Sequence, residues 1–121
     1  MANPFVHVEL STTDLKKARD FYGKLFDWKL EDMPMGGGES YTMIGVGEGT
    51  GGGMMKHPMP GAPSMWLAYV LVNDVASSVK KAKSLGATII KDVSDVPGYG
   101  QFAIFQDPTG AMLALWKPAK K

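Results

Sequence analysis

The stretches FVHVELSTTDL (residues 5–15) and MWLAYVLVNDV (residues 65–75) decide the fold. Each reads as a β-strand followed by the start of a helix, and the capping residues Asp14 and Asp74 stand 60 positions apart. The same spacing relates the ends of the two halves, KHP at residues 56–58 and WKP at residues 116–118. An internal repeat of this length indicates two copies of one supersecondary unit related by a pseudo-twofold axis.

Period-two alternation of apolar residues predicts four strands in each copy. The predicted strands of the first copy cover residues 5–10, 28–31, 40–46 and 52–56. Those of the second copy cover residues 65–72, 87–93, 101–106 and 111–116. One helix follows each capping aspartate, where apolar residues recur at helical spacing. We therefore expect an α+β fold in which two βαβββ modules form a curved, barrel-like mixed sheet around a cleft. The first module covers residues 1–58, a linker covers 59–64, and the second module covers 65–121.

Length and composition restrict the classes of protein open to this chain. Its 121 residues suit one compact domain, and 45% hydrophobic residues are ordinary for a globular protein. A net charge of +1 offers no field for nucleic acid or an anionic membrane, and no apolar run reaches the roughly 20 residues of a membrane span. The absence of cysteine excludes disulfides, thiolate metal sites and a cysteine nucleophile. The start of the sequence shows no signal peptide, so we expect a cytoplasmic protein without nucleic-acid or membrane partners.

The first strand separates two faces of the predicted sheet. Val6, Val8 and Leu10 lie on one side of it, whereas His7 and Glu9 lie on the other. We expect the helices to cover the side of Val8, and the side of His7 to line the cleft. The same alternation assigns further residues to the cleft face, namely Tyr41, Met43, Met54, Leu67, Tyr69, Gln101, Ala103, Phe105, Ala114 and Trp116. Two ionisable side chains on an otherwise apolar strand are the best local indication of a site.

The cleft residues divide into a polar and an apolar group. His7 and Glu9 lie about 6–7 Å apart along the strand, which suits two contacts on one ligand better than a tight dyad. They can act as a base and its partner or orient a polar ligand, or His7 can be a remnant satisfied by a hydrogen bond. The aromatic and methionine side chains form either an adaptable apolar pocket or simply core. The predicted ligand-binding residues are His7, Glu9, Tyr41, Met43, Met54, Tyr69, Gln101, Phe105 and Trp116, with His7 and Glu9 as the candidate catalytic pair.

Two further features are assigned structural roles. The glycine run Gly51–Gly53 lacks the Gly-x-x-x-x-Gly-Lys-Ser/Thr pattern and leads into a strand, so it does not predict a phosphate loop. We expect it to permit a bulge or close backbone packing. Trp66 falls on the helix-facing side of its strand and is expected in the core.

Three segments carry a resemblance to a known family: FVHVEL at residues 5–10, the helical stretch 14–28 with Phe21-Tyr22, and FAIFQDPTG at residues 102–110. The Phe-Tyr pair and the Asp-Pro-x-Gly turn before the last strand are typical of the vicinal oxygen chelate superfamily. This superfamily includes glyoxalase I, bleomycin-resistance proteins, fosfomycin-resistance enzymes and extradiol dioxygenases. The chain resembles it over nearly the whole length, and most closely its small glyoxalase-related proteins. The resemblance implies the paired βαβββ fold and a homodimer.

The resemblance also implies where a metal would sit. Metalloenzymes of this family hold a divalent metal on four paired strand positions, which fall in this chain at His7, Met54, Leu67 and Ala114. Only His7 is a ligand type, because leucine and alanine cannot coordinate a metal and a thioether is too soft for Mn²⁺, Fe²⁺ or Mg²⁺. A catalytic metal generally has about three protein ligands, and the only other histidine, His57, lies at the linker. We therefore expect no metal and no other cofactor.

Three functions fit these residues. The preferred one is a metal-independent protein that binds a small, largely apolar or aromatic molecule in the cleft, in the manner of the bleomycin-resistance branch. The second is a glyoxalase-like lyase or isomerase that uses His7 and Glu9 as acid–base groups without metal. A metalloenzyme with a rearranged site is the least favoured. Bleomycin itself is cationic and this chain is near neutral, so we do not name that ligand.

Overall fold

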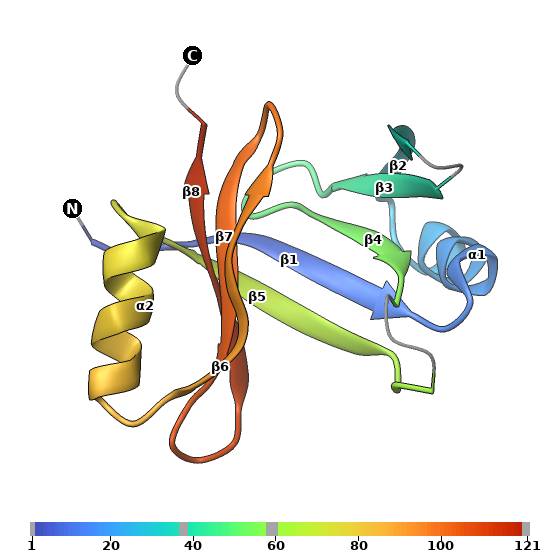
Figure 1. The fold of residues 1–121 in the computed structure, drawn as a ribbon. Coiled ribbons are helices and arrows are strands. Elements are labelled where there is room, and N and C mark those ends of the chain that lie inside the picture. Colours follow the sequence, from blue (N-terminus) through green and yellow to red (C-terminus); the bar gives the residue numbers. More distant parts are fainter. Residues whose placement is uncertain (1, 37–38, 58–60, 120–121) are drawn as a thin grey trace. The chain divides into compact units, whose positions relative to one another are not determined.

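A computed structural model describes residues 2–36, 39–57 and 61–119 of the chain. The described residues form eight strands and two helices in the order of two βαβββ modules (Figure 1). The predicted α+β fold with paired modules is therefore confirmed. The chain divides into two compact units, which we call the N-terminal unit (His7–Leu67) and the C-terminal unit (Met1–Val6 with Ala68–Lys121).

The order of elements repeats once along the chain. The first module contains β1 (Phe5–Thr12), α1 (Leu15–Leu25), β2 (Lys29–Gly36), β3 (Glu39–Gly45) and β4 (Gly52–Lys56). The second module contains β5 (Met65–Leu71), α2 (Val75–Ser84), β6 (Thr88–Val96), β7 (Gly100–Gln106) and β8 (Met112–Pro118). The predicted linker at residues 59–64 falls between β4 and β5, and residues 58–60 lie outside the described part of the chain.

Both helices begin where the sequence predicts. The Asp14 carboxylate accepts a hydrogen bond from the Lys17 backbone N–H at 3.0 Å, and Asp74 accepts one from Ser77 at 3.0 Å. Each aspartate satisfies a backbone donor that has no partner inside the helix, a contribution of about 1 kcal/mol. No helix among the described residues combines the length and the apolar character that a membrane crossing requires.

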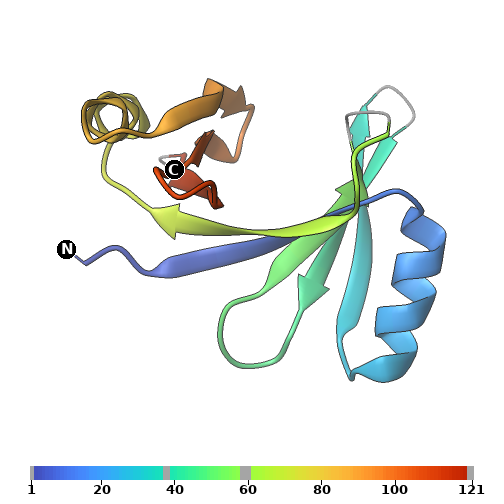
Figure 2. The same ribbon diagram turned by 90° about the horizontal axis from the view of Figure 1, so that it is seen from below.

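The N-terminal unit is a four-stranded sheet with α1 along one face (Figure 2). Its strand order is β2-β3-β4-β1, with β4 parallel to β1 and the other pairs antiparallel. The core on the helix side is built on Leu10, Ile44 and Met54, and Leu15 and Ala18 of α1 pack against it. The odd-numbered residues of β1 consequently face the opposite side of the sheet, as predicted.

The C-terminal unit repeats this arrangement. Its strand order is β5-β8-β7-β6, with β5 parallel to β8 and the other pairs antiparallel. Its core combines Val75 and Val79 of α2 with Ala103 of β7 and Leu115 of β8. The two helices thus occupy equivalent positions in the two modules, each against the later strands of its own module.

The repeat is not free of gaps, which corrects one expectation from the sequence. Leu10 pairs with Met54, and Val70, 60 residues after Leu10, pairs with Leu115, which is 61 residues after Met54. Strand β6 carries two register shifts, at Ile89–Lys91 and at Lys91–Ser94. A bulge inserts a residue without a partner, so the spacing of the later strands changes by one. Every face assignment on β7 that relied on a constant spacing is affected.

Candidate functional site

A hydrogen-bonded chain of three side chains lies on the face of the N-terminal unit opposite α1. The Tyr41 hydroxyl of β3 lies 2.7 Å from His7 Nε2 of β1, and it donates a hydrogen bond of 2.9 Å to Glu9 Oε1. The three side chains are partly buried. Three of the predicted site residues therefore meet through one tyrosine hydroxyl, which bridges the two groups that the sequence singled out on β1.

The glycine run makes room for this chain. Glu9 pairs with Gly53, and Gly53 pairs with Met43, so these residues share the open face of the sheet. A Cβ atom at position 53 would collide with the ring of Tyr41. A Cβ atom at position 52 would collide with the Val8 backbone carbonyl. The predicted close packing at Gly51–Gly53 is confirmed, and its consequence is that the tyrosine ring lies directly over β4.

The hydrogen bonds determine how the protons are arranged. Burial holds the pKa of His7 below its ordinary value, and the nearby Glu9 charge opposes this shift only in part. The imidazole is therefore neutral near pH 7 and carries one N–H. Because the single hydrogen of the Tyr41 hydroxyl is directed to Glu9, His7 Nε2 must be the donor to the tyrosine oxygen, and Nδ1 carries the lone pair. The chain runs from imidazole to phenol to carboxylate, an arrangement suited to holding or passing on a proton.

The apolar part of the predicted site divides differently from the prediction. Met43 lies on the open face beside Glu9 and is 41% exposed. Met54 was assigned to the same face, and this assignment is wrong: its side chain is fully buried on the helix side with Leu10 and Ile44. The run of glycines before Met54 carries no side-chain pattern, so the sequence could not determine the register of β4.

The C-terminal unit carries three neighbouring aromatic rings, one of which the sequence analysis missed. The ring centroids of Phe102 and Trp116 each lie 6.5 Å from that of Tyr69. Tyr69 is buried and pairs with Ala114, while Trp116 pairs with Phe102. Counted with the 61-residue spacing of the later strands, Phe102 is the counterpart of Tyr41. The register shifts in β6 concealed this relation from the sequence.

Two residues predicted on this face lie on the other side of β7. Phe105 packs against the α2 core, and Ala103, two residues before it, belongs to that core. Gln101 shares this side by alternation, and its side chain donates a hydrogen bond of 2.8 Å to Asp95. Both were placed by carrying the faces of the first module across the extra residue in β6. We accordingly leave Gln101, Phe105 and Met54 out of the site.

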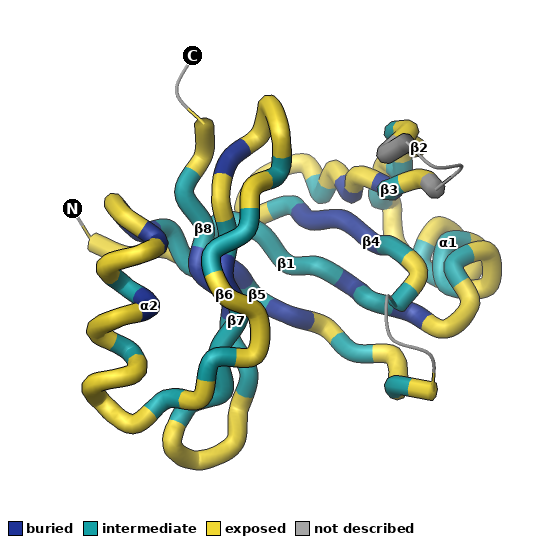
Figure 3. The backbone as a smooth tube through the Cα atoms, in the orientation of Figure 1, coloured by how far each residue is buried: buried dark blue, intermediate teal, exposed yellow. Residues whose placement is uncertain are grey.

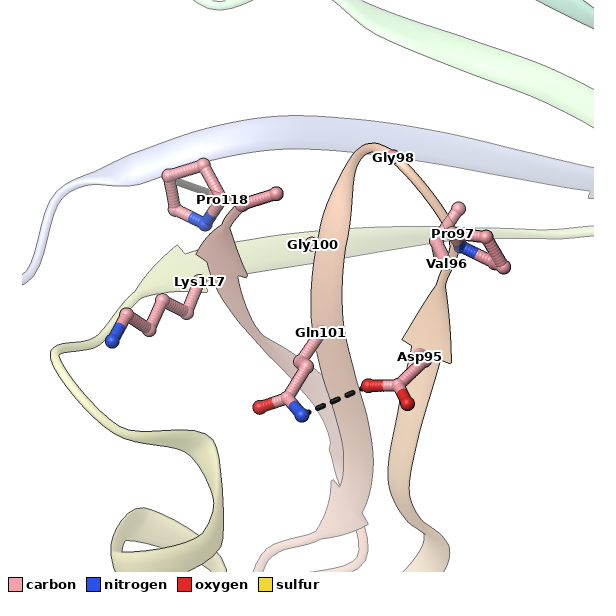
Figure 4. A pocket seen from close by; sticks show the side chains of 9 residues that line it. Asp95, Val96, Pro97, Gly98, Gly100, Gln101, Lys117 and Pro118 are labelled. Atoms are coloured by element: carbon pink, nitrogen blue, oxygen red, sulfur yellow. Dashed lines mark hydrogen bonds between the residues drawn. The ribbon is translucent and has the colours of Figure 1, made fainter. Parts of the chain in front are cut away.

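Gln101 instead borders a shallow hollow of about 440 Å³ in the C-terminal unit (Figure 4). The hollow lies between the β6–β7 turn and the end of β8, and the bond from Gln101 to Asp95 crosses one side of it. Backbone and proline atoms make up much of its lining, and Lys117 is its only cationic lining residue among those described. The arrangement offers a ligand few converging polar groups, so it does not compete with the chain of His7, Tyr41 and Glu9.

The residues at the family's metal positions do not fit a divalent ion. Met54 lies in the core and points away from His7, whereas Leu67 and Ala114 carry no donor atom. The residues of β4 that share the face of His7 are Gly51 and Gly53, which have no side chain to coordinate with. Within the described ranges, no group of three or more histidine, aspartate or glutamate side chains is arranged to hold a metal. We therefore derive no chemical step through a metal.

Comparison with known proteins identifies the family. Residues 5–115 match the model of the glyoxalase/bleomycin resistance protein/dioxygenase superfamily. The chain belongs to this superfamily. The resemblance of the strand and turn motifs to this group of proteins is thereby confirmed.

Two kinds of relatives have similar sequences. The putative glyoxylase CFP32 of Mycobacterium bovis is 34% identical over 111 residues, which are 92% of this chain and 42% of that protein. The anthracycline biosynthesis protein DauV of Streptomyces sp. strain C5 is 27% identical over 123 residues, covering 90% of this chain and 45% of that protein. The chain thus spans less than half the length of the relatives it matches.

Solved structures agree with the fold. A hypothetical protein of Bacillus halodurans C-125 superimposes with a TM-score of 0.72 at 18% identity, covering 100% of this chain and 98% of that one. Methylmalonyl-CoA epimerase of Mycobacterium tuberculosis gives a TM-score of 0.70 at 15% identity, with coverages of 96% and 88%. At this level of identity the likeness concerns the fold alone.

Proposed function

We propose that this chain binds a small, largely apolar or aromatic molecule, without a divalent metal, on the open face of the N-terminal unit. The observation that carries the proposal is the chain of hydrogen bonds from His7 through Tyr41 to Glu9. Small-molecule sites typically combine apolar surface with a few precisely held polar groups. Met43 supplies exposed apolar surface next to Glu9, and the polar chain supplies both donors and acceptors.

The names of the relatives suggest the chemistry of the ligand. One is an anthracycline biosynthesis protein and another a putative glyoxylase. Anthracyclines are polycyclic aromatic compounds rich in carbonyl and phenol groups. A phenol hydroxyl held between an imidazole and a carboxylate is a suitable partner for such groups, because it can exchange hydrogen bonds with a neutral oxygen. We therefore propose aromatic carbonyl compounds as the ligand class.

The test is a screen of polycyclic aromatic and small aromatic carbonyl compounds by thermal shift in EDTA, followed by titration calorimetry of the strongest. Tyr41→Phe removes the bridging hydroxyl while retaining the ring, so we expect affinity to fall about tenfold, the effect of losing one net hydrogen bond. The matched control is Tyr99→Phe, because Tyr99 lies in a turn and is 59% exposed. Equal affinity of the wild type and both variants for every compound would contradict the site.

Acid–base catalysis by the same residues is the second candidate function. It is favoured by the neutral imidazole of His7 and its connection through Tyr41 to Glu9, which together can hold and return a proton. We propose a lyase or isomerase acting on a carbonyl or hemithioacetal substrate. Turnover should persist in EDTA and disappear in His7→Ala and Glu9→Ala. Turnover that appears only after Ni²⁺, Mn²⁺ or Fe²⁺ is added would refute this candidate.

A further inference from the structure

The two equivalent helices are buried to very different extents. In α2, Val75 is 1% exposed and Val79 is 6% exposed. In α1 no residue is buried, although its apolar residues recur on one side of the helix (Figure 3). The same module architecture therefore covers the apolar side of one helix and leaves that of the other in contact with solvent.

Aromatic side chains extend this exposed area beyond α1. Phe21 is 58% exposed, Leu25 55%, Phe26 45% and Trp66 39%. Trp66 lies on the helix side of its strand as predicted, but it is not the core residue that we expected. We call the set formed by Phe21, Tyr22, Leu25, Phe26, Trp28 and Trp66 the aromatic surface.

The rings of the aromatic surface hold one another in place. Tyr22 lies at the centre, with ring centroids at 4.9 Å from Phe21, 5.4 Å from Trp66 and 5.8 Å from Trp28. Phe26 and Trp28 are a further pair at 4.7 Å. Edge-to-face and stacked contacts at these distances fix the ring positions, so the surface exists before any partner arrives. A preformed surface loses little side-chain entropy when it binds.

The extent of the aromatic surface points to a protein partner. Four side chains of this kind, each burying about 150–250 Å² when covered and each about half exposed, leave roughly 400 Å² of contiguous apolar surface. Monomeric proteins seldom expose patches larger than a few hundred Å², and larger ones usually mark interaction sites. The same area is about half of what one partner contributes to a standard interface of ~800 Å² per side.

We propose that the aromatic surface is the interface through which two copies of this chain associate. A twofold interface uses the same patch on both partners, and aromatic rings are self-complementary because edges pack on faces. The net charge of +1 leaves little repulsion between copies. The matching relatives carry more additional chain than the part they share with this one, enough for a further domain of similar size. A second copy supplies such a domain here.

The experiment measures the mass of the full chain in solution by sedimentation over a range of concentrations. We expect a dimer for the wild type. Phe21→Glu places a charge in the centre of the contact and should weaken association at least about 30-fold, as loss of an interface hot spot does. Leu85→Glu is the matched control, because Leu85 is 69% exposed at the end of the other helix and should leave the dimer intact.

A second variant guards against misfolding. Trp66→Gln also lies in the aromatic surface but on β5, and it should weaken the dimer as Phe21→Glu does while the far-ultraviolet circular dichroism stays unchanged. A wild type that remains monomeric at all concentrations overturns the proposal, whether or not another protein binds the surface. A dimer that persists in both folded variants, or that dissociates equally in Leu85→Glu, overturns it as well.

Discussion

Truncating Met54 distinguishes the register of β4 in the structure from the one expected from the sequence. Met54 is fully buried between β1 and α1, where Leu10 and Ile44 surround it. Met54→Ala removes three heavy atoms from a packed core, a change that costs about 2–5 kcal/mol in comparable sites. We expect about 3 kcal/mol here. At about 4 °C per kcal/mol for a domain of this size, the melting temperature should fall by ~10 °C.

Met43 is the internal comparison for this prediction. Both methionines were assigned to the cleft face from the sequence, yet Met43 is 41% exposed, so Met43→Ala should cost less than about 1 kcal/mol. Urea unfolding followed by circular dichroism measures both values, and equal m-values for the two variants would show that the midpoints report stability. If Met54→Ala costs no more than Met43→Ala, the burial of Met54 and the register of β4 derived from it are wrong.

Three further changes test other parts of the structure. Gly53→Ala should displace the Tyr41 ring and destabilise the fold by about 1–3 kcal/mol in urea unfolding, whereas Gly45→Ala, which meets only ordinary contacts, should be nearly neutral. Because burial holds the pKa of His7 below the ordinary value of about 6.5, the unfolded chain takes up a proton first, so the free energy of unfolding should decrease as the pH falls below ~6.5 and level off below the folded pKa. His7→Asn should remove this part of the slope in the same assay. Asp74→Ala should cost about 1 kcal/mol, seen as a lower melting temperature, by removing the cap of α2; a neutral result would mean that the cap contributes nothing to stability.

Local patterns predicted most of the fold. The capping aspartates at 14 and 74 and the alternation on β1 depend only on neighbouring residues, so helix starts and the two faces of β1 could be read directly. Strand β2 runs to Gly36 instead of ending near residue 31, since its pairing with β3 outweighs the low strand propensity of Pro34.

The candidate site could be predicted only where no register had to be carried across an irregularity. His7, Glu9 and Tyr41 precede the bulges of β6, and alternation alone placed them on one face. Phe102 was missed and Phe105 wrongly included because one extra residue reverses the two faces of β7. Bulges depend on pairing with a distant strand, and that information is not contained in a local pattern. The prediction of one cleft lined by both modules stays a prediction.

The central claim is that the chain of His7, Tyr41 and Glu9 binds an aromatic carbonyl compound without a metal. The measurement that tests it most directly is native mass spectrometry of the full chain with its tightest-binding compound, in EDTA and again after Ni²⁺ or Mn²⁺ is added. The account predicts the same fraction of ligand-bound protein in both conditions and no stoichiometric metal. A complex that forms only together with one bound metal ion per chain would contradict it.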